Sequence, residues 1–485
     1  MTGNGGSNGG AGGARTVEVN VDYVSRVEGH GNIVVVAEND LPTEVRFEVT
    51  EPPRFFEAML RGRPYDQAPL ITSRICGICS NGHVLASITA MEATLGITPT
   101  RQTKLLRRLL MHGETIQSHV LHAYFLVAPD FFDVGSVVPL AGTHPEVVKR
   151  ALRLKKLGND LCEVVGGRAV HQVAAVVGGF THLPTPEALT AVRTRLVEAG
   201  GDLQETVTLF ASLDMPAFSR PTEYLSLTYG EAGGDEAGGG EAYAFFGDHI
   251  LSSEGGTIPV SDYRDKVRER VVAHSSAKHC APGDGTATDT FMVGALARLN
   301  NGFDRLSDGA KAAAADLGFQ PTCTNTFMNT VAQLIETVHC VEDSVMIIDR
   351  LLDEGLKAEP PEVEIRAGRG AGAVEVPRGT LYHEYAVDDA GLIVEANLII
   401  PTGQNLANLE QDMWALAPQV LPQGKEKAQK AMEMLVRAYD PCISCSTHVI
   451  YLDGEGNESA GDDAGHSHRA DHQGTGASGP EEVTA

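Results

Sequence analysis

Positive charge is scarce in this chain. There are 38 Lys and Arg residues against 64 Asp and Glu residues, which gives a formal net charge of −26. A protein that binds nucleic acid directly normally carries a basic patch or stripe, so this balance argues against that class of function. The acidic excess favours solubility but says nothing about chemistry. We therefore expect a solvated acidic surface and no nucleic-acid partner.

Long apolar runs and targeting signals are also missing. No run approaches the roughly 20 apolar residues that a membrane-spanning helix needs, so we expect no direct membrane span. Residues 1–15 are rich in Gly and lack the basic and apolar regions of a secretory signal, which predicts a flexible arm. With 42% hydrophobic residues, the remainder has the composition of a globular protein with a sizeable core.

The spacing of apolar residues predicts the secondary structure. Alternation and β-branched residues indicate strands near 16–24, 32–39 and 44–50, and a second β region over 372–405 with a hairpin turn at the sequence DDAG. Apolar residues at three- and four-residue steps predict helices near 54–62, 78–97, 100–127, 146–165, 186–213, 260–275, 325–355, 404–417 and 424–438. A Gly/Glu-rich loop is expected over 230–242. We predict an α+β, mainly α-helical fold: one large domain over 16–448, with a core of long helices and small β-sheets from the N-terminal and C-terminal regions.

Four of the eight cysteines form two CxxC pairs. Each pair is followed by a histidine: Cys76, Cys79 and His83 in one motif, and Cys442, Cys445 and His448 in the other. Each pair lies at a helix end, where backbone N–H groups stabilise thiolates. Four thiolates can hold zinc tetrahedrally or bind a soft redox metal. The remaining cysteines have the scattered positions of small buried apolar residues: Cys162, Cys280, Cys323 and Cys340.

The spacing of the pairs leaves two kinds of metal site open. A structural zinc site is the commonest use of paired CxxC motifs and would make the protein a noncatalytic scaffold. Zinc ribbons, however, usually separate their pairs by about 15 to 20 residues, whereas these pairs lie near opposite ends of the chain. A thioredoxin-like redox motif needs a βαβ context that neither pair has.

Several other polar residues have unusual surroundings. Glu28 lies in a glycine-flanked turn, where a carboxylate can transfer protons or simply face solvent. Glu57 lies among apolar residues, and a buried acid requires a cation or a hard metal. Arg378 stands between Pro and Gly, so its guanidinium projects from a rigid turn. Pro401 and Thr402 follow an apolar strand, a place where backbone N–H groups and a hydroxyl can be offered to a ligand.

Taken together, these motifs resemble the large, catalytic subunit of nickel–iron hydrogenases over about residues 17–452. The similar segments are RVEGH (26–30), FFEAMLRGR (55–63), RICGICSNGH (74–83), GGRAVHQ (166–172), VPRG (376–379), IIPTGQN (399–405) and DPCISCSTH (440–448). The two cysteine motifs at opposite ends are the most specific. SNGH after the second cysteine and HQ in GGRAVHQ depart from the family's commonest wording, which affects the choice of branch more than the chemistry.

The resemblance implies a binuclear metal site. Cys76, Cys79, Cys442 and Cys445 would bind nickel, and the second cysteine of each pair would also bridge to an iron that carries one carbonyl and two cyanide ligands, Fe(CN)2(CO). His83 would hydrogen-bond a bridging thiolate.

The resemblance also implies a reaction, the reversible heterolytic cleavage of H2. The Cys442 thiolate would accept the proton, and Glu28 would relay it outward. Arg378 would lie near the open coordination position, while Pro401 and Thr402 would line the pocket of the diatomic iron ligands.

A second metal and a processing step are implied near the C-terminus. Glu57, His448 and the backbone carbonyl of Leu398 would hold Mg2+ or a similar cation. A maturation protease would cut between His448 and Val449 after metal-insertion chaperones have delivered nickel, so that 449–485 is a maturation tail. The alternative is a retained, solvated tail.

Electrons must leave through other protein chains, because this one has no further cysteine cluster for iron–sulfur binding. The resemblance implies further diaphorase-type subunits and an iron–sulfur small subunit. The wording of the motifs is closer to the cytoplasmic multisubunit branch, which exchanges electrons with NAD(P), a deazaflavin coenzyme or another soluble carrier. A metal-free relative in the NADH dehydrogenase lineage is a further alternative, which the presence of all four cysteines disfavours.

Overall fold

The computed structural model describes residues 16–230, 243, 245–281 and 289–447, and the backbone of residues 451–452 and 458–459. The chain divides into two units, residues 1–449 and 450–485. In the second unit, β15 (Tyr451–Leu452) pairs antiparallel with β16 (Glu458–Ser459). The arm predicted for 1–15, most of the loop predicted for 230–242, and the cleavage position after His448 lie outside the described residues.

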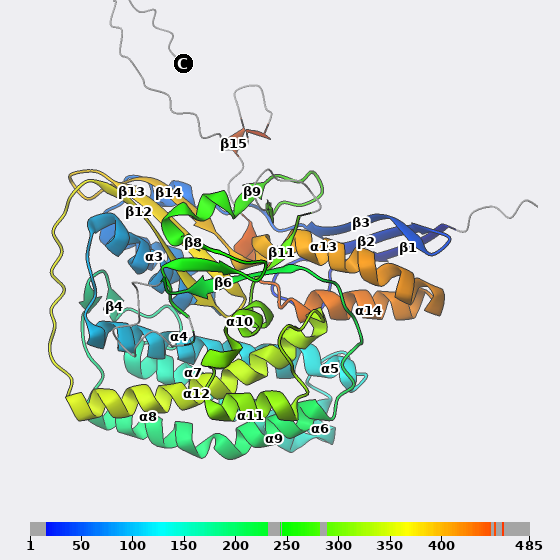
Figure 1. The fold of residues 1–485 in the computed structure, drawn as a ribbon, viewed down its shortest axis with the longest axis horizontal. Coiled ribbons are helices and arrows are strands. Elements are labelled where there is room, and N and C mark those ends of the chain that lie inside the picture. The colour runs from blue at the N-terminus through cyan, green and yellow to red at the C-terminus, as the bar shows by residue number, and fades with distance from the viewer. Residues whose placement is uncertain are drawn as a thin grey trace, which may run out of the picture. The chain divides into compact units, whose positions relative to one another are not determined.

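The first three strands form an antiparallel sheet in the order β1-β2-β3: β1 (Thr16–Val21), β2 (Gly31–Glu38) and β3 (Leu41–Val49). Along β2, Ile33, Val35 and Ala37 are fully buried while their neighbours are half-buried, so the predicted alternation is confirmed. The sheet packs against α13 (Pro401–Val420) and α14 (Lys425–Ala438), as Figure 1 shows. The two ends of the large unit therefore lie side by side.

Long helices form the lower layer in Figure 1. α4 (Arg101–Leu121) continues through a π-helical turn at His122–Val127 into α5 (Ala128–Phe131), and it packs against both α7 and α12. Thr100 caps the start of α4 by accepting a hydrogen bond from the N–H of Thr103. The other helices of this part are α6 (Leu140–Thr143), α7 (Pro145–Gly166), α8 (Pro186–Glu198), α9 (Gly200–Ala211), α10 (Ala295–Gly302), α11 (Asp308–Asp316) and α12 (Asn329–Glu354).

A second antiparallel sheet, β12-β13-β14, carries the helix that follows the first cysteine motif. Its strands are β12 (Gly368–Val376), β13 (Gly379–Val387) and β14 (Ile393–Ile399), and the predicted hairpin at 388–391 is confirmed by a hydrogen bond from Gly391 N–H to Asp388 O. The helix α3 (Ser80–Leu95) lies directly on β12. A Cβ at Gly372 would stand 2.4 Å from the backbone nitrogen of Ala90, so only glycine permits this approach. Short elements complete the region: α1 (Phe56–Leu60), α2 (Ala68–Thr72), β4 (Ala175–Val176) and β5 (Gly179–Phe180).

The middle of the chain differs from the prediction. The helix expected over 260–275 is wrong, because Val260–Asp265 is a 3-10 turn and β9 (Arg268–Arg270) then pairs with β10 (His279–Ala281). A further sheet of order β11-β6-β7-β8 was not predicted: β6 (Glu223–Thr228), β7 (His249–Ser252), β8 (Thr257–Pro259) and β11 (Phe291–Met292). Every residue of β6 is buried, so it shows no alternation, and the other strands are too short to give a periodic signal.

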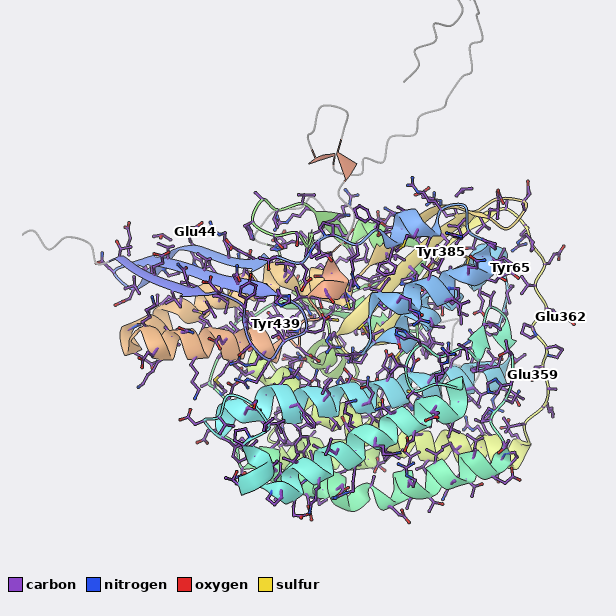
Figure 2. The ribbon with its side chains drawn as sticks, turned by 180° about the vertical axis from the view of Figure 1, so that it is seen from behind. Glu44, Tyr65, Glu359, Glu362, Tyr385 and Tyr439 are labelled. Carbon is purple, nitrogen blue, oxygen red and sulfur yellow. The ribbon has the colours of Figure 1, made fainter. Side chains whose placement is uncertain are left out.

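Two further features complete the fold. The helix predicted over 186–213 is two helices, which break at Gly200 and Gly201, where glycine weakens the helical backbone. Between α12 and β12 an extended segment runs along the surface, and Figure 2 labels Glu359 and Glu362 on it, with Tyr385 inside the molecule. Within the described part of the chain, no helix is long and apolar enough to cross a membrane. The predicted class, α+β and mainly helical with small sheets, is confirmed.

The buried ion pair between α3 and α4 provides a test of this packing. Arg107 donates to both carboxylate oxygens of Glu92 at 2.6 and 2.8 Å, and each side chain is 5% exposed. Arg107→Met should lower the free energy of unfolding by about 3–5 kcal/mol, since it leaves a buried carboxylate without its cation. Arg101→Met, which breaks the exposed pair with Glu354, should cost less than about 1 kcal/mol. Urea unfolding of both variants measures the difference, and equal losses would contradict it.

Candidate metal centre

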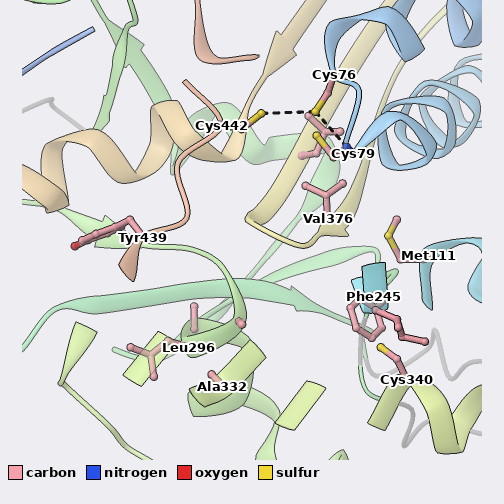
Figure 3. Close-up of a cluster of buried hydrophobic side chains, with 14 of the residues drawn as sticks. Cys76, Cys79, Met111, Phe245, Leu296, Ala332, Cys340, Val376, Tyr439 and Cys442 are labelled. Atoms are coloured by element: carbon pink, nitrogen blue, oxygen red, sulfur yellow. Dashed lines mark hydrogen bonds between the residues drawn. The ribbon is translucent and has the colours of Figure 1, made fainter. Parts of the chain in front are cut away.

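The structure brings the two CxxC motifs together. Cys76 and Cys442 are 366 residues apart in sequence, yet their sulfur atoms are 3.6 Å apart. The sulfur atoms of Cys442 and Cys445 are 2.7 Å apart, too far for a disulfide bond of about 2.05 Å. Including Cys79, all four sulfur atoms lie within 4.8 Å of one another, and all four residues are buried. Figure 3 shows Cys76, Cys79 and Cys442 gathered above Val376.

Four thiols at this separation cannot all ionise without a cation. Hydrogen bonds from Cys442, Cys445 and Cys79 lower the pKa of Cys76 well below that of an ordinary thiol. The same neighbours, together with burial, raise the pKa of Cys442. For Cys79 and Cys445, the hydrogen bond with Cys442 lowers the pKa, but Cys76 and burial outweigh it, so both pKa values are raised. The cluster therefore favours one thiolate by itself, and binding through all four sulfurs requires a metal ion to displace the other protons.

Backbone groups of the first motif already point at its sulfur. The sulfur of Cys76 accepts hydrogen bonds from the N–H groups of Ile78 and Cys79, at 3.3 and 3.1 Å. Cys79 is the N-terminal flanking residue of α3, where the helix dipole stabilises negative charge. The N–H groups of Asn81 and Gly82, in the first turn of α3, donate to the carboxylate of Glu114 on α4. Burial and the nearby charge of Cys76 raise the pKa of Glu114 to about 8.

The second motif is held by the N-terminal segment and by α13. The N–H of Cys442 donates to the hydroxyl of Thr402 at 2.9 Å, in the first turn of α13. Ile443 N–H donates to the backbone oxygen of Glu28, while the Glu28 carboxylate accepts from both the N–H and the hydroxyl of Ser444. Gly29 has φ +85°, and a Cβ there would stand 2.8 Å from Ser444 N. Only glycine therefore lets the two segments meet at this point.

Arg54 joins the two cysteine motifs, a role that was not predicted. Its guanidinium donates to Ile75 O at 2.7 Å, beside the first motif, and to Ser444 O inside the second. Two backbone carbonyls are thereby satisfied by one cation close to the cluster. The sequence signal was weak, because Arg54 follows two prolines and precedes an apolar pair, with nothing to indicate what it contacts.

Arg378 provides a fixed positive charge beside the cluster. It donates to the backbone oxygen and the carboxylate of Asp440 at 2.7 and 2.9 Å, and to the hydroxyl of Ser118 at 3.4 Å. Burial lowers the pKa of Arg378, but Asp440 and the thiols of Cys442, Cys79 and Cys76 outweigh burial, so its pKa is raised. Asp440 directly precedes the second motif and was not among the predicted site residues.

A buried ionic network fixes the turn that carries Arg378. Arg298 donates to the backbone oxygens of Val376 and Pro377 at 3.0 and 3.1 Å. Its guanidinium also pairs with Glu336 of α12 and Glu375 of β12, and all three side chains are at most 2% exposed. Although burial raises the pKa of Glu336, Arg298 and His119 lower it to about 2. No sequence signal pointed to this network, because its members are single charges in otherwise ordinary helices and strands.

The predicted ligand pocket residues and His83 come from neighbouring elements. Pro401 and Thr402 occupy the first turn of α13. His83 lies one turn into α3, where Nδ1 is 3.4 Å from Nε2 of His383 on β13. His383 in turn contacts the Tyr385 hydroxyl at 2.8 Å, so the imidazole of His83 belongs to a buried polar chain. Its predicted contact with a thiolate stays a prediction.

Of the predicted magnesium ligands, two lie on packed elements. Glu57 is on α1 and is 9% exposed, while Leu398 is fully buried on β14, and these two elements pack together. His448 lies outside the described residues. Its neighbour Thr447 accepts a hydrogen bond at 3.4 Å from the N–H of Arg54, three residues before Glu57.

Comparison with known proteins identifies relatives along nearly the whole chain. The sequence profile of the family described as nickel-dependent hydrogenase matches residues 54–145 and 287–448. The alpha subunit of sulfhydrogenase 1 from Pyrococcus furiosus is 36% identical over 435 residues, which cover 90% of this chain and 98% of that protein. A protein of the F420-non-reducing hydrogenase from Methanothermobacter marburgensis is 32% identical over 461 residues, with 90% and 95% covered. A solved NAD+-reducing [NiFe]-hydrogenase in the H2-reduced state superimposes with a TM-score of 0.78 at 30% identity, covering 90% and 99% of the two chains.

The hydroxyl of Thr402 gives a test of how the second motif is held. Thr402→Val keeps the shape of the side chain but leaves the buried Cys442 N–H without an acceptor, which should cost about 1–3 kcal/mol of stability. We expect the variant to retain less nickel and to unfold at a lower temperature. Thr402→Ser, which keeps the hydroxyl, should behave like the unaltered protein. Nickel per chain after dialysis and the thermal midpoint measure both effects; equal nickel retention in the two variants would contradict the argument.

Proposed function

Because this chain belongs to the nickel-dependent hydrogenase family, as a large, catalytic subunit, we propose that its four buried cysteines hold a nickel–iron centre. The protein is an oxidoreductase, a hydrogenase that interconverts H2 with protons and electrons. One observation carries the assignment of the centre. Sulfur atoms from motifs at opposite ends of the chain lie within 4.8 Å of one another and are buried. A four-cysteine zinc scaffold is not favoured, since the named relatives are hydrogenases.

The donor set suits soft metals. In this proposal Cys76, Cys79, Cys442 and Cys445 bind nickel, and Cys79 and Cys445 also bind an iron with carbonyl and cyanide ligands, Fe(CN)2(CO). Support comes from the chemistry of the site, because thiolates select soft transition metals and the nearby Arg378 and Arg54 offset part of their negative charge. When bound, the centre supplies heterolytic cleavage of H2.

The chain itself supplies the proton path. Cys442 is the proposed base, since a thiolate can both bind a metal and accept a proton. Glu28 is the proposed relay. It pairs with Cys442 in a short parallel bridge, its carboxylate accepts hydrogen bonds from Ser444, and its side chain is half-buried. A carboxylate at this depth connects the buried cluster with the outside.

Three further residues shape the centre. Arg378 is proposed to stabilise the negative charge of the thiolates with a guanidinium that Asp440 and Ser118 hold in place. Thr402 and Pro401 are proposed to line the pocket of the iron's diatomic ligands. The Thr402 oxygen accepts from Cys442, which leaves the hydroxyl hydrogen free in direction for a cyanide nitrogen. His83 is proposed to hydrogen-bond a bridging thiolate.

A second cation is proposed near the end of the large unit. Glu57, the backbone carbonyl of Leu398 and His448 would bind Mg2+ through hard oxygen donors and one imidazole. Burial of Glu57 and the packing of α1 on β14 support this set. We also propose that a maturation protease cuts between His448 and Val449, so that the mature domain spans 16–448 and 449–485 is removed once metal-insertion chaperones have finished.

Partner subunits must carry the electrons. Several similar proteins are named as subunits of sulfhydrogenase, F420-non-reducing and NAD-reducing hydrogenases. Outside the cluster, the remaining cysteines are free thiols, and in the described residues they join no group of potential metal ligands. We therefore propose an iron–sulfur small subunit, further electron-transfer subunits of diaphorase type, a soluble electron carrier and a cytoplasmic location.

Composition of the purified, active protein tests the centre. We expect about one nickel and one iron per chain, infrared bands of metal-bound carbonyl and cyanide, and an intact mass that ends at His448. Zinc alone, or no infrared bands in metal-loaded protein, would overturn the nickel–iron centre. An intact mass that includes residues up to Ala485 in active enzyme would overturn only the processing step.

Glu28→Gln tests the relay. The amide keeps an acceptor for Ser444 but cannot carry a proton, so H2/D+ exchange and turnover should fall by at least about 100-fold while nickel content and infrared bands stay unchanged. Glu51→Gln is a matched control, because Glu51 is a half-buried carboxylate that pairs with His30. Full exchange activity in Glu28→Gln would remove Glu28 from the path.

A further inference from the structure

A second group of potential metal ligands lies outside the cysteine cluster. His274, His279 and Glu410 each offer one ligand atom, and these atoms all lie within 4.8 Å of one another. Both histidines belong to the β9–β10 hairpin, with His274 in its turn and His279 at the start of β10, while Glu410 is on α13. Two imidazoles and one carboxylate from segments far apart in sequence thus meet at one point.

The distances within the group suit a shared ion. Nε2 of His274 is 2.7 Å from one carboxylate oxygen of Glu410, and Nδ1 of His279 is 3.9 Å from the other. The longer gap exceeds a hydrogen bond. Two ligand atoms that each lie about 2.0–2.2 Å from one metal ion are separated by roughly 3.3–4 Å. The gap between His279 and Glu410 is therefore wide enough for a cation to occupy.

Burial makes the state of His279 unusual. The residue is 1% exposed, and its Nε2 has no hydrogen-bond partner within the described ranges, while its Nδ1 lies beyond hydrogen-bond distance of Glu410. Buried polar groups in proteins normally have a partner, and leaving one without costs about 1–3 kcal/mol. A metal ion bound to this imidazole would supply a strong partner where the carboxylate is too far away to do so.

The carboxylate is already oriented by the protein. Glu410 Oε1 accepts a hydrogen bond at 2.9 Å from the backbone N–H of Phe47 in β3. The turn of the hairpin is tied to the same strand, because Ser276 donates from N–H and hydroxyl to Val49 O. Such supporting contacts fix the direction of metal ligands and raise affinity.

We propose that His274, His279 and Glu410 bind a divalent transition-metal ion of the zinc type, with water in the fourth position. Imidazole and carboxylate donors suit zinc, whereas the four-cysteine cluster selects softer chemistry. The ion fastens the β9–β10 hairpin to α13, the helix whose first turn holds Cys442 through Thr402. This site is independent of the proposed nickel–iron centre and of the proposed magnesium ligands.

Zinc binding by the full-length, nickel-loaded protein tests the site. The protein is dialysed against about 1 µM free zinc, and zinc and nickel per chain are measured by mass spectrometry. We expect one zinc per chain, and at least about 100-fold weaker zinc binding in His274→Ala and in Glu410→Gln, with nickel unchanged. Glu410→Gln keeps an oxygen for Phe47 N–H, so it preserves the local fold. His249→Ala is the control, because His249 in β7 pairs with Asp248, which directly precedes that strand.

X-ray absorption at the zinc edge identifies the donors. We expect nitrogen and oxygen at about 2.0 Å and no sulfur shell, since zinc–sulfur bonds are near 2.3 Å. Three results would overturn the proposal: no zinc in the unaltered protein, zinc that persists at equal affinity in both variants, or a sulfur shell around the bound zinc.

Discussion

The mutual repulsion of four buried thiolates is the constraint on which the rest of this structure depends. Their sulfur atoms lie within 4.8 Å of one another, where solvent cannot screen them. Without a cation the cluster favours a single thiolate at Cys76 and holds the other three protons. A metal ion resolves the conflict, and so the metal completes the contact between the first and last segments of the large unit.

Protein groups around the cluster supply the remaining compensation. Arg54 bridges the two motifs through their backbone carbonyls, and Arg378 adds a guanidinium that Asp440 holds in place. The turn that carries Arg378 is fixed by Arg298, which pairs with Glu336 inside the helical layer. Positive charge near the sulfurs is thus anchored step by step into the core, which preorganises the site before any metal binds.

α13 connects the two metal-binding regions of this chain. Its first turn accepts the Cys442 N–H through Thr402, and Glu410, two turns further along, meets the histidines of the β9–β10 hairpin. In a hydrogenase, a rigid helix between the centre and the proposed zinc-type site gives the second motif a support that does not depend on the nickel–iron centre itself. The N-terminal sheet packs on the same helix and completes this support.

The sequence by itself determined the metal-binding cysteines, the mainly helical class and the N-terminal and C-terminal sheets. Local patterns encode these features: CxxC spacing at helix ends, apolar periodicity over long helices, and alternation in half-buried strands such as β2. Tertiary structure alone decided the pairing of the motifs, the roles of Arg54, Asp440 and Arg298, the fully buried strand β6, and the meeting of His274 and His279 with Glu410. Each of these depends on contacts between residues far apart in the chain, and a local pattern carries no record of which distant residue a single charge or a short strand will face.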